Sequence, residues 1–264
     1  AGAITIGTPT FRFRHTVVVN IPKAAKQVLF GRQMRSLFTV DWENKYRLVG
    51  HDASGLELRM LAHYINDDTF TSEVVEGDIH TKNQRDAGLP NRDAAKTFIY
   101  AFNYGAGDAK IGSIIGGNRA AGKRIKQKFL GNNPKLAEFI ARTERAGKRG
   151  YLLGLDGRKL HLRRDKFTGQ IQTHKALNTL LQAAGAIVMK YSMYYLDKWV
   201  QEYKLDVKKV IDMHDEGQAE VHYRDVEMYK LLAVQSIRQA GIHLGLNVPL
   251  DGEAKVGTNW AQTH

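Results

Sequence analysis

The chain has 264 residues, with 39 Lys and Arg against 27 Asp and Glu, which gives a formal net charge of +12. Its 43% apolar and 25% charged residues are typical of a folded protein and exclude an intrinsically disordered chain. Cysteine is absent, which excludes disulfides, thiol catalysis and cysteine-ligated metal sites. No apolar run reaches the roughly 18 to 20 residues that span a bilayer, and the first residues do not resemble a secretory signal. We therefore expect a soluble cytoplasmic protein with no membrane partner.

The positive charge is concentrated in two segments. Residues 1–50 carry 8 basic and 2 acidic side chains, and residues 119–166 carry 15 basic and 4 acidic ones. The rest of the chain has 16 basic and 21 acidic side chains, a net charge of −5. Lysine and arginine can simply keep helix faces exposed to water. However, the two segments together carry more positive charge than the net charge of the whole chain, which favours a polyanionic partner.

Hydrophobic patterning and capping signals predict a mixture of strands and helices. In chain order, the expected elements are a strand at 46–52, a helix at 56–64, polar turns up to Asn91, helices at 92–104, 119–150 and 174–200, strands at 207–213 and 218–223 and a helix at 225–240. Residues 214–217 are expected to form the turn between the last two strands. Strands that do not alternate regularly with helices indicate an α+β fold.

Two aspartates lie at the ends of predicted strands, 163 positions apart. Asp52 ends the first strand, and Asp215 lies in the turn between the last two. Each one alone fits a turn or capping residue. As a pair they fit two-metal phosphoryl transfer, in which carboxylates hold two magnesium ions roughly 3.5–4 Å apart. The spacing in the sequence does not show that they meet.

The predicted helix at 92–104 carries a stripe of functional side chains. Arg92, Lys96 and Tyr100 recur every four residues and fall within one narrow face. Two cations followed by an aromatic ring could bind a triphosphate and stack on a base or sugar. A solvated basic face with a half-buried tyrosine explains the same pattern equally well.

Two amides lie one turn apart on the otherwise apolar helix at 174–200. Asn178 and Gln182 need hydrogen-bond partners if they are buried. They are either satisfied inside the core or reach base edges in a minor groove, where amide donors suit the shared acceptors.

Several ordered stretches resemble the polymerase motifs of family A DNA polymerases, the relatives of bacterial DNA polymerase I, with bacteriophage replicative enzymes nearest. The resemblance runs from about residue 10 to the C-terminus. The stretches are HDASGLELR at 51–59, GDIH at 77–80, RDAAKTFIY at 92–100, LDGR at 155–158, LNTLLQ at 177–182 and HDE at 214–216. They are long and follow the family's order, so chance agreement does not explain them.

The resemblance implies a role for each residue of the catalytic and nucleotide site. Asp52 and Asp215, with the Ala53 carbonyl, would hold two Mg²⁺ ions, with Mn²⁺ as a possible substitute. The triphosphate would be held by His80, Arg92 and Lys96, and Lys96 would also protonate the leaving pyrophosphate. Tyr100 would pack at the nucleotide and templating base. Glu57 would lie beneath the sugar and exclude a 2′-hydroxyl.

The resemblance also implies contacts with the primer–template. The residues concerned are Arg12, Arg158, Asn178, Gln182, His214 and Glu216. Glu216 would lie near the primer terminus in a supporting role. The family's opening Thr-Gly-Arg is Thr10-Phe11-Arg12 here, so this stretch departs from the family pattern at Phe11.

The implied architecture is a right-hand palm, an antiparallel sheet with packed helices, together with helical fingers. We expect palm at 1–71, fingers at 72–154 and palm again at 155–264. Thumb and exonuclease domains are expected to be absent. The chain would then be a fragment of a larger polymerase or a subunit that works with a separate thumb- or exonuclease-bearing polypeptide or another replication protein.

The resemblance implies a template-directed DNA polymerase that binds primer–template DNA and deoxynucleoside triphosphates, in the host cytoplasm if a bacteriophage encodes it. Two alternatives remain. A single-subunit RNA polymerase would share the carboxylates and the 92–100 stripe, but Glu57 argues against it. A non-catalytic nucleic-acid-binding relative would keep the basic patches without needing both carboxylates.

Overall fold

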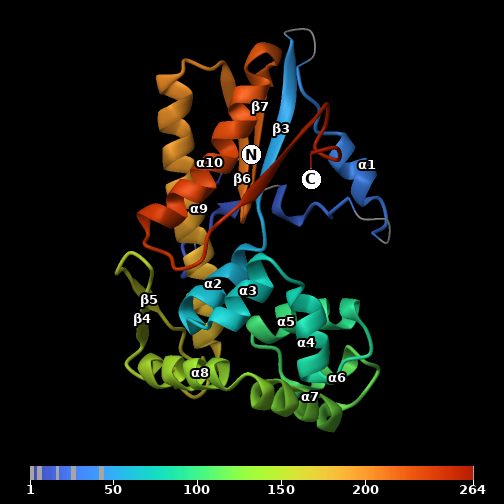
Figure 1. Ribbon diagram of the computed structural model, residues 1–264, viewed down its shortest axis with the longest axis vertical. Coiled ribbons are helices and arrows are strands. Elements are labelled where there is room, and N and C mark those ends of the chain that lie inside the picture. Colours follow the sequence, from blue (N-terminus) through green and yellow to red (C-terminus); the bar gives the residue numbers. More distant parts are fainter. Residues whose placement is uncertain (1–2, 5–7, 16–17, 25–27, 42–44, 264) are drawn as a thin grey trace. The chain divides into compact units, whose positions relative to one another are not determined.

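The computed structural model describes residues 3–4, 8–15, 18–24, 28–41 and 45–263 (Figure 1). The chain divides into two compact units. Unit 1 comprises residues 1–56 and 185–264, and unit 2 comprises residues 57–184.

Unit 1 is built on an antiparallel sheet with the strand order β6-β7-β3-β8. Its strands are β3 (Tyr46–Ala53), β6 (Val207–Met213), β7 (Glu216–His222) and β8 (Gly252–Gly257). The first three were expected from the sequence. The fourth, β8, was not, because it is a short edge strand whose polar side chains give no apolar run.

The turn between β6 and β7 is tighter than the sequence suggested. Met213 pairs with Glu216, so only His214 and Asp215 form the turn and Glu216 and Gly217 belong to β7. The expected four-residue turn at 214–217 was therefore wrong. Polar residues at the start of β7 looked like a turn, but cross-strand pairing with β6 and β3 makes them part of the sheet.

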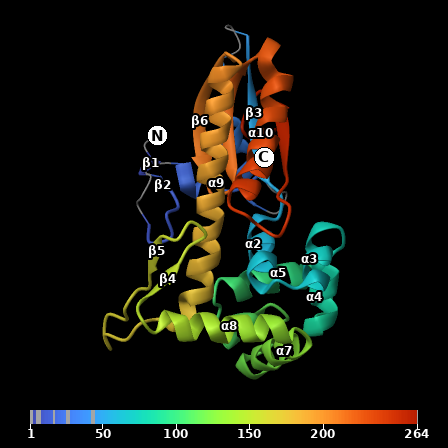
Figure 2. The same ribbon diagram turned by 60° about the vertical axis from the view of Figure 1, so that its left-hand side comes forward.

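Two long helices cover one face of this sheet. Figures 1 and 2 show α9 (Ala176–Glu202) and α10 (Val226–His243) side by side along the strands. The core between them includes Val49 of β3, Val221 of β7, Leu196 of α9 and Tyr229 of α10. Because side chains alternate along a strand, Leu48 and Tyr46 point to the opposite face, where they pack with Trp260.

The remaining elements of unit 1 are short. They are β1 (Ala3–Ile4), β2 (Arg14–His15), η1 (Val18–Asn20), α1 (Gly31–Ser36) and η3 (Tyr223–Asp225). The mixed composition of unit 1, an antiparallel sheet with packed helices, agrees with the α+β class expected from the sequence.

Unit 2 is mostly helical. It contains most of α2 (Leu56–Ile65), α3 (Asp68–Val75), α4 (Ile79–Ala87), α5 (Arg92–Asn103), α6 (Asp108–Ser113), α7 (Arg119–Asn132), α8 (Pro134–Gly147), the hairpin β4 (Tyr151–Leu153) with β5 (Lys159–His161), and η2 (Thr173–Lys175). The helix expected at 119–150 is divided, because Pro134 begins a new helix.

The segment before Asn91 was expected to form polar turns, and this was wrong. It forms helices α3 and α4, each of which begins at an aspartate. Asp67 accepts a hydrogen bond from the backbone of Phe70, and Asp78 accepts hydrogen bonds from the backbones of His80 and Thr81. These N-caps satisfy donors that the first helical turn leaves unpaired, which compensates for a sparse apolar face.

Aromatic packing holds α5 against α7. Phe98 and Phe102 of α5 both contact Phe129 of α7, with ring centroids 5.0 and 5.3 Å apart. Phe98 and Phe129 are fully buried. This face of α5 is therefore fixed in the core, and the opposite face, which carries Arg92 and Lys96, is exposed.

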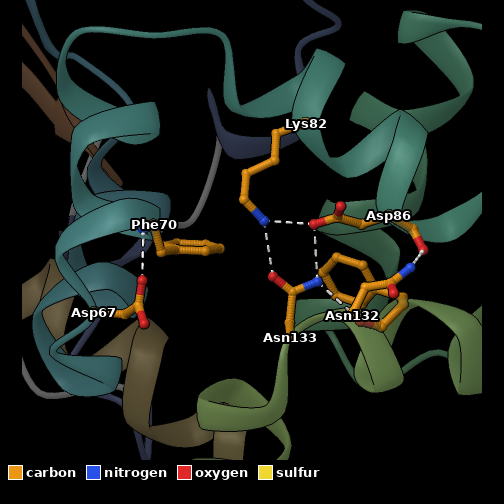
Figure 3. Close-up of polar contacts among 7 residues, drawn as sticks. Asp67, Phe70, Lys82, Asp86, Asn132 and Asn133 are labelled. Carbon is orange, nitrogen blue, oxygen red and sulfur yellow. Dashed lines mark hydrogen bonds and ion pairs between the residues drawn. The ribbon is translucent and has the colours of Figure 1, made fainter.

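A polar junction ties α4 to the end of α7 (Figure 3). Lys82 donates from Nζ to Asp86 at 2.5 Å and to the side-chain oxygen of Asn133 at 3.0 Å. Asn133 in turn donates to the Asp86 carboxylate, and Asn132 donates to the Asp86 backbone carbonyl. Each group in the junction satisfies another, so α4 is anchored at the end opposite to His80.

Helices α6 and α7 approach so closely that their contact requires glycine. A Cβ on Gly122 would lie 1.8 Å from the backbone oxygen of Asp108 and 2.6 Å from the backbone nitrogen of Gly112. Gly131, near the end of the same helix α7, has no such neighbour within 4 Å.

These two glycines provide a matched test of the packing. Gly122→Ala should lower the free energy of unfolding by about 1–3 kcal/mol, because backbone atoms must move apart. Gly131→Ala should leave it unchanged or raise it by about 0.5–1 kcal/mol, because alanine is the better helix former. Urea denaturation of both variants followed by circular dichroism measures the difference. Equal effects at the two positions would contradict this close packing.

Candidate active site

The structure brings Asp52 and Asp215 to adjacent strand ends within unit 1. Strand β3 pairs with β7 in a register that sets Asp52 opposite Glu216. One residue further along β3, the backbone N–H of Ala53 donates to the backbone carbonyl of Asp215 at 3.0 Å. The juxtaposition that sequence spacing could not establish is therefore a result of β-sheet register.

The environment of the two aspartates suits a hard metal ion. Asp215 is exposed and Asp52 is partly exposed, so neither is sealed in the core. Magnesium is commonly held by one or two carboxylates, with water and substrate phosphate completing the shell. Within the described ranges, no group of three or more acidic or histidine side chains gathers to form a metal site. Binding of a metal ion by Asp52, Asp215 and the Ala53 carbonyl, as expected from the sequence, stays a prediction.

The tight turn forces an unusual backbone conformation next to Asp215. His214 adopts φ 60°, in the left-handed region that non-glycine residues rarely occupy. Desolvation of the ring and the positive charge of Arg12 lower the pKa of His214. Arg12 and His214, which were both expected to contact primer–template, therefore lie near each other.

Glu216 is buried in a network that the sequence did not reveal. Its Oε1 accepts hydrogen bonds from the indole of Trp260 and the side chain of Gln218. Its Oε2 lies 3.8 Å from the guanidinium of Arg35, which stacks 4.1 Å from the Trp260 ring centroid. Thr263 extends the network with a hydrogen bond to Gln218 at 2.7 Å. These contacts favour a positioning role for Glu216.

On the opposite face of the sheet, the buried side chain of His51 packs against the same strand ends. Its ring packs against Gly217, where a Cβ would lie 2.3 Å from Cε1, and its centroid lies 6.3 Å from that of Tyr229. Burial, with a further contribution from Lys209, lowers the pKa of His51 to about 4. His51 is therefore neutral at pH 7, and Gly217 is required because the ring occupies the space of a side chain.

The nucleotide-binding residues expected from the sequence lie in unit 2. Helix α5 begins as predicted, because Asn91 accepts a hydrogen bond from the backbone of Ala94 at 2.8 Å. Arg92 and Lys96 are exposed, and Tyr100, one turn further on, is half-buried. The predicted stripe thus exists as an exposed basic face that ends on an aromatic ring.

His80 of α4 joins this stripe. Its ring centroid lies 6.2 Å from that of Tyr100. Desolvation, followed by the charges of Arg92 and Lys96, lowers the pKa of His80. Its Nδ1 is buried and has no hydrogen-bond partner among the described residues. Four of the five residues expected at the nucleotide, namely His80, Arg92, Lys96 and Tyr100, therefore belong to one cluster.

One acidic residue of this cluster was missed by the sequence analysis. Asp78 forms an ion pair with Arg92, with 2.8 Å between Oδ2 and Nε. The signal that could have identified it is the capping pattern, in which Asp78 is followed three residues later by Thr81 at the start of a helix.

The remaining predicted residues of unit 2 have partners within the protein or are half-buried. Arg158 forms a forked ion pair with Asp156 at the β4–β5 turn. Asn178 donates from Nδ2 to the carbonyl of Tyr104 at 3.0 Å, so this atom is satisfied within the protein. Gln182 and Glu57 are both half-buried. Contacts of these side chains with DNA or nucleotide stay a prediction.

A family model described as DNA polymerase family A matches residues 8–262. The chain belongs to this family. Polymerases of the family generally use divalent metal ions, which agrees with the oxygen donors at Asp52 and Asp215.

Curated relatives support the family assignment. A DNA-directed DNA polymerase of Escherichia phage Phieco32 is 40% identical over the whole chain, which covers 55% of that relative. A DNA-directed DNA polymerase of Escherichia phage T7 is 37% identical over 89% of the chain, which covers 37% of that relative. The DNA polymerase I of Pseudomonas aeruginosa is 28% identical, with 27% of its length covered. The chain therefore spans about half or less of the length of these relatives.

A solved structure shares the fold. The POL domain of Pol1 from M. smegmatis, in complex with DNA primer-template and dNTP, matches 98% of this chain with a TM-score of 0.87. The match covers 48% of that chain, and the sequence identity is 21%. In the part of the chain that the structure describes, every helix is too short or too polar to cross a membrane.

The buried His51 predicts a pH dependence of stability. Its pKa is lowered from 6.5 to about 4 in the folded protein, so the unfolded state binds the proton first as the pH falls. The stabilisation is complete above pH 6.5 and is lost between pH 6.5 and 4, by at most about 3 kcal/mol. Urea denaturation at several pH values should show that the free energy of unfolding falls less steeply with decreasing pH in His51→Phe than in the wild type. The same pH dependence in both proteins would show that His51 is not its cause.

Proposed function

We propose that this chain is the catalytic palm and fingers of a template-directed DNA polymerase, which adds deoxynucleotides to a primer 3′ hydroxyl and releases pyrophosphate. The observation that supports the proposal most directly is the pairing of β3 with β7, which brings Asp52 next to Asp215 at the strand ends. Membership of DNA polymerase family A agrees with it.

The proposed chemistry at the carboxylates is charge stabilisation. Asp52, Asp215 and the Ala53 carbonyl would hold two Mg²⁺ ions, or Mn²⁺ in their place. When bound, such ions neutralise charge on the attacking and leaving oxygens of an in-line displacement. The chain contributes the fixed positions of its oxygen donors, because the strand ends and the turn are set before substrate arrives.

The proposed chemistry in unit 2 is binding of the triphosphate. Arg92 and Lys96 present cations from one face of α5, and His80 adds a ring nitrogen beside them. Lys96 would donate a proton from Nζ to the leaving pyrophosphate. Tyr100 would pack on the nucleotide and templating base, and Glu57 would occupy the space beneath the sugar that a 2′-hydroxyl needs.

The proposed partners are primer–template DNA and deoxynucleoside triphosphates, and the proposed site of action is the cytoplasm of a bacterial host. Arg12, Arg158, Asn178, Gln182, His214 and Glu216 are assigned to the primer–template side. The basic segments at 1–50 and 119–166 would bind phosphates. Residues 1–71 and 155–264 would form the palm, and residues 72–154 the fingers. A polypeptide with a thumb or exonuclease, or another replication protein, would complete the enzyme.

Primer extension by this chain tests the proposal. A labelled primer on a longer template is incubated with Mg²⁺ and either deoxy- or ribonucleoside triphosphates. We expect extension with deoxynucleotides in template order. Extension with ribonucleotides alone would indicate an RNA polymerase, and duplex binding without any extension, with or without added partner proteins, would indicate a non-catalytic relative.

The two carboxylates provide the first functional prediction. Asp52→Asn and Asp215→Asn should each lower the rate of extension at least about a thousandfold, because a several-kcal/mol stabilisation of the transition state is lost. DNA affinity should be retained, because it comes mainly from the basic segments. Single-turnover extension and a filter-binding assay measure the two quantities.

Asp197→Asn is the matched control, because this partly exposed carboxylate lies in the same unit and pairs only with Lys209 among the described contacts. It should extend primers at the wild-type rate. Near-normal turnover in either Asp52→Asn or Asp215→Asn would overturn the two-metal assignment.

Glu57 provides a prediction about sugar selection. Glu57→Ala should raise ribonucleotide incorporation relative to deoxynucleotide incorporation by about tenfold or more, because removing the side chain opens space for a 2′-hydroxyl. Competitive extension with both nucleotides measures the ratio. Glu138→Ala, an exposed position on α8, is the control and should leave the ratio unchanged. An unchanged ratio in Glu57→Ala would move the sugar selection to another residue.

A further inference from the structure

A single carboxylate connects the two helices that carry the proposed triphosphate ligands. Asp78 begins α4, and its Oδ1 accepts hydrogen bonds from the backbones of His80 and Thr81 at 3.1 and 3.4 Å. Its Oδ2 accepts a hydrogen bond from the Thr81 hydroxyl at 2.7 Å and another from Arg92 at 2.8 Å. Arg92 is the first residue of α5. Asp78 therefore orients the start of α4 and the first side chain of α5 together.

The ion pair uses only one edge of the Arg92 guanidinium. The bond to Asp78 is made by Nε, and neither Nη atom hydrogen-bonds to any residue that the structure describes. A guanidinium has five N–H groups in a fixed fork, so the four on the two Nη atoms remain available. Their direction is set because the Nε end is held, which is the geometry needed to bind a phosphate with two parallel bonds.

We propose that Asp78 is a positioning residue that fixes the Arg92 guanidinium, and the start of the helix carrying His80, in the orientation that binds the triphosphate of the incoming nucleotide. The proposal rests on the function proposed above. Asp78 does not itself contact the nucleotide, since a carboxylate repels phosphate, and it acts through Arg92.

Exposure indicates that this ion pair serves orientation more than stability. The side chains of Arg92 and Asp78 are 52% and 43% exposed, and ion pairs at such sites contribute little to folding. Asp67 is a similar residue elsewhere in unit 2. It caps α3 through the backbone of Phe70 (Figure 3) and forms an ion pair with Lys135 at 2.9 Å.

The direction in which triphosphate affinity changes when Asp78 is replaced distinguishes an orienting role from a purely electrostatic one. Removing a carboxylate makes the cluster more positive, so a purely Coulombic influence of Asp78 would make triphosphate binding tighter in its absence. An orienting role predicts weaker binding, because Arg92 then samples many rotamers and must be ordered when phosphate binds. Asparagine retains an oxygen that can cap the helix, so Asp78→Asn removes the ion pair with little change to α4.

The test measures nucleotide use and phosphate binding in the full chain. We expect Asp78→Asn to raise the KM for deoxynucleoside triphosphates about fivefold or more, with a smaller effect on kcat. Binding of inorganic tripolyphosphate, measured by calorimetry without DNA, should weaken by a similar factor. The midpoint of thermal unfolding should stay at the wild-type value, which separates this role from a structural one.

Two variants serve as controls for the same loss of charge. Asp67→Asn removes a capping carboxylate and its ion pair away from the cluster, and it should change tripolyphosphate affinity by less than about twofold. Asp93→Asn removes a carboxylate next to Arg92 whose charge acts on that guanidinium. Asp93→Asn should leave the affinity for tripolyphosphate unchanged or raise it, because a negative charge that repels phosphate has been removed.

A double-mutant cycle shows whether Asp78 acts through Arg92. In an Arg92→Ala background, Asp78→Asn should cause no further loss of affinity, because the group that it positions is gone. Additive losses, or an Asp78→Asn variant that binds tripolyphosphate as tightly as the wild type or more tightly, would overturn the proposal. Failure of the proposed function gives a different result, namely no primer extension by the wild type while tripolyphosphate binding still depends on Asp78.

Discussion

The antiparallel register between β3 and β7 is the constraint on which the rest of unit 1 depends. It sets Asp52 opposite Glu216, so that the N–H of Ala53 reaches the carbonyl of Asp215 at the turn. Because side chains alternate with a period of two, a slip of one residue would turn Asp52 to the opposite face and remove Val49 from the core that it shares with α9 and α10. The register is held by apolar residues on both faces of the sheet, so the core and the carboxylate pair are specified by the same contacts.

The two faces of the sheet support the strand ends by different chemistry. On the helix-covered face, the neutral ring of His51 fills the space above Gly217. On the other face, the charge of Glu216 is satisfied by Trp260 and Arg35 in a buried network. Breaking a buried ion pair of this kind costs about 3–5 kcal/mol, because one charge is left without a partner. Such support holds the strand ends that carry Asp52 and Asp215, as the proposed catalysis by preorganised groups requires.

In unit 2, core packing and the proposed binding of nucleotide use different faces of a single helix, α5. One face of α5 contributes Phe98 and Phe102 to an aromatic core, and the other carries the exposed cations. The ion pair between Asp78 and Arg92 adds little to folding because water screens it, yet it limits the directions that the guanidinium can take. The inferred role of Asp78 follows from this division, since Arg92 is held by a contact that contributes little to folding.

The sequence by itself determined the elements with strong local signals. Strand β3, the Asn91-capped helix α5 and the long helix α9 all lie close to where periodicity and capping put them. It also identified Asp52, Asp215 and the cations of α5 as candidates. Only the tertiary structure decided that the two aspartates are neighbours and that Asp78 holds Arg92. Those relations depend on pairing between segments far apart in the chain, which local propensity and spacing do not encode. Helices α3 and α4 were missed for a related reason, because their stability comes from capping and from packing on other helices rather than from a long apolar face.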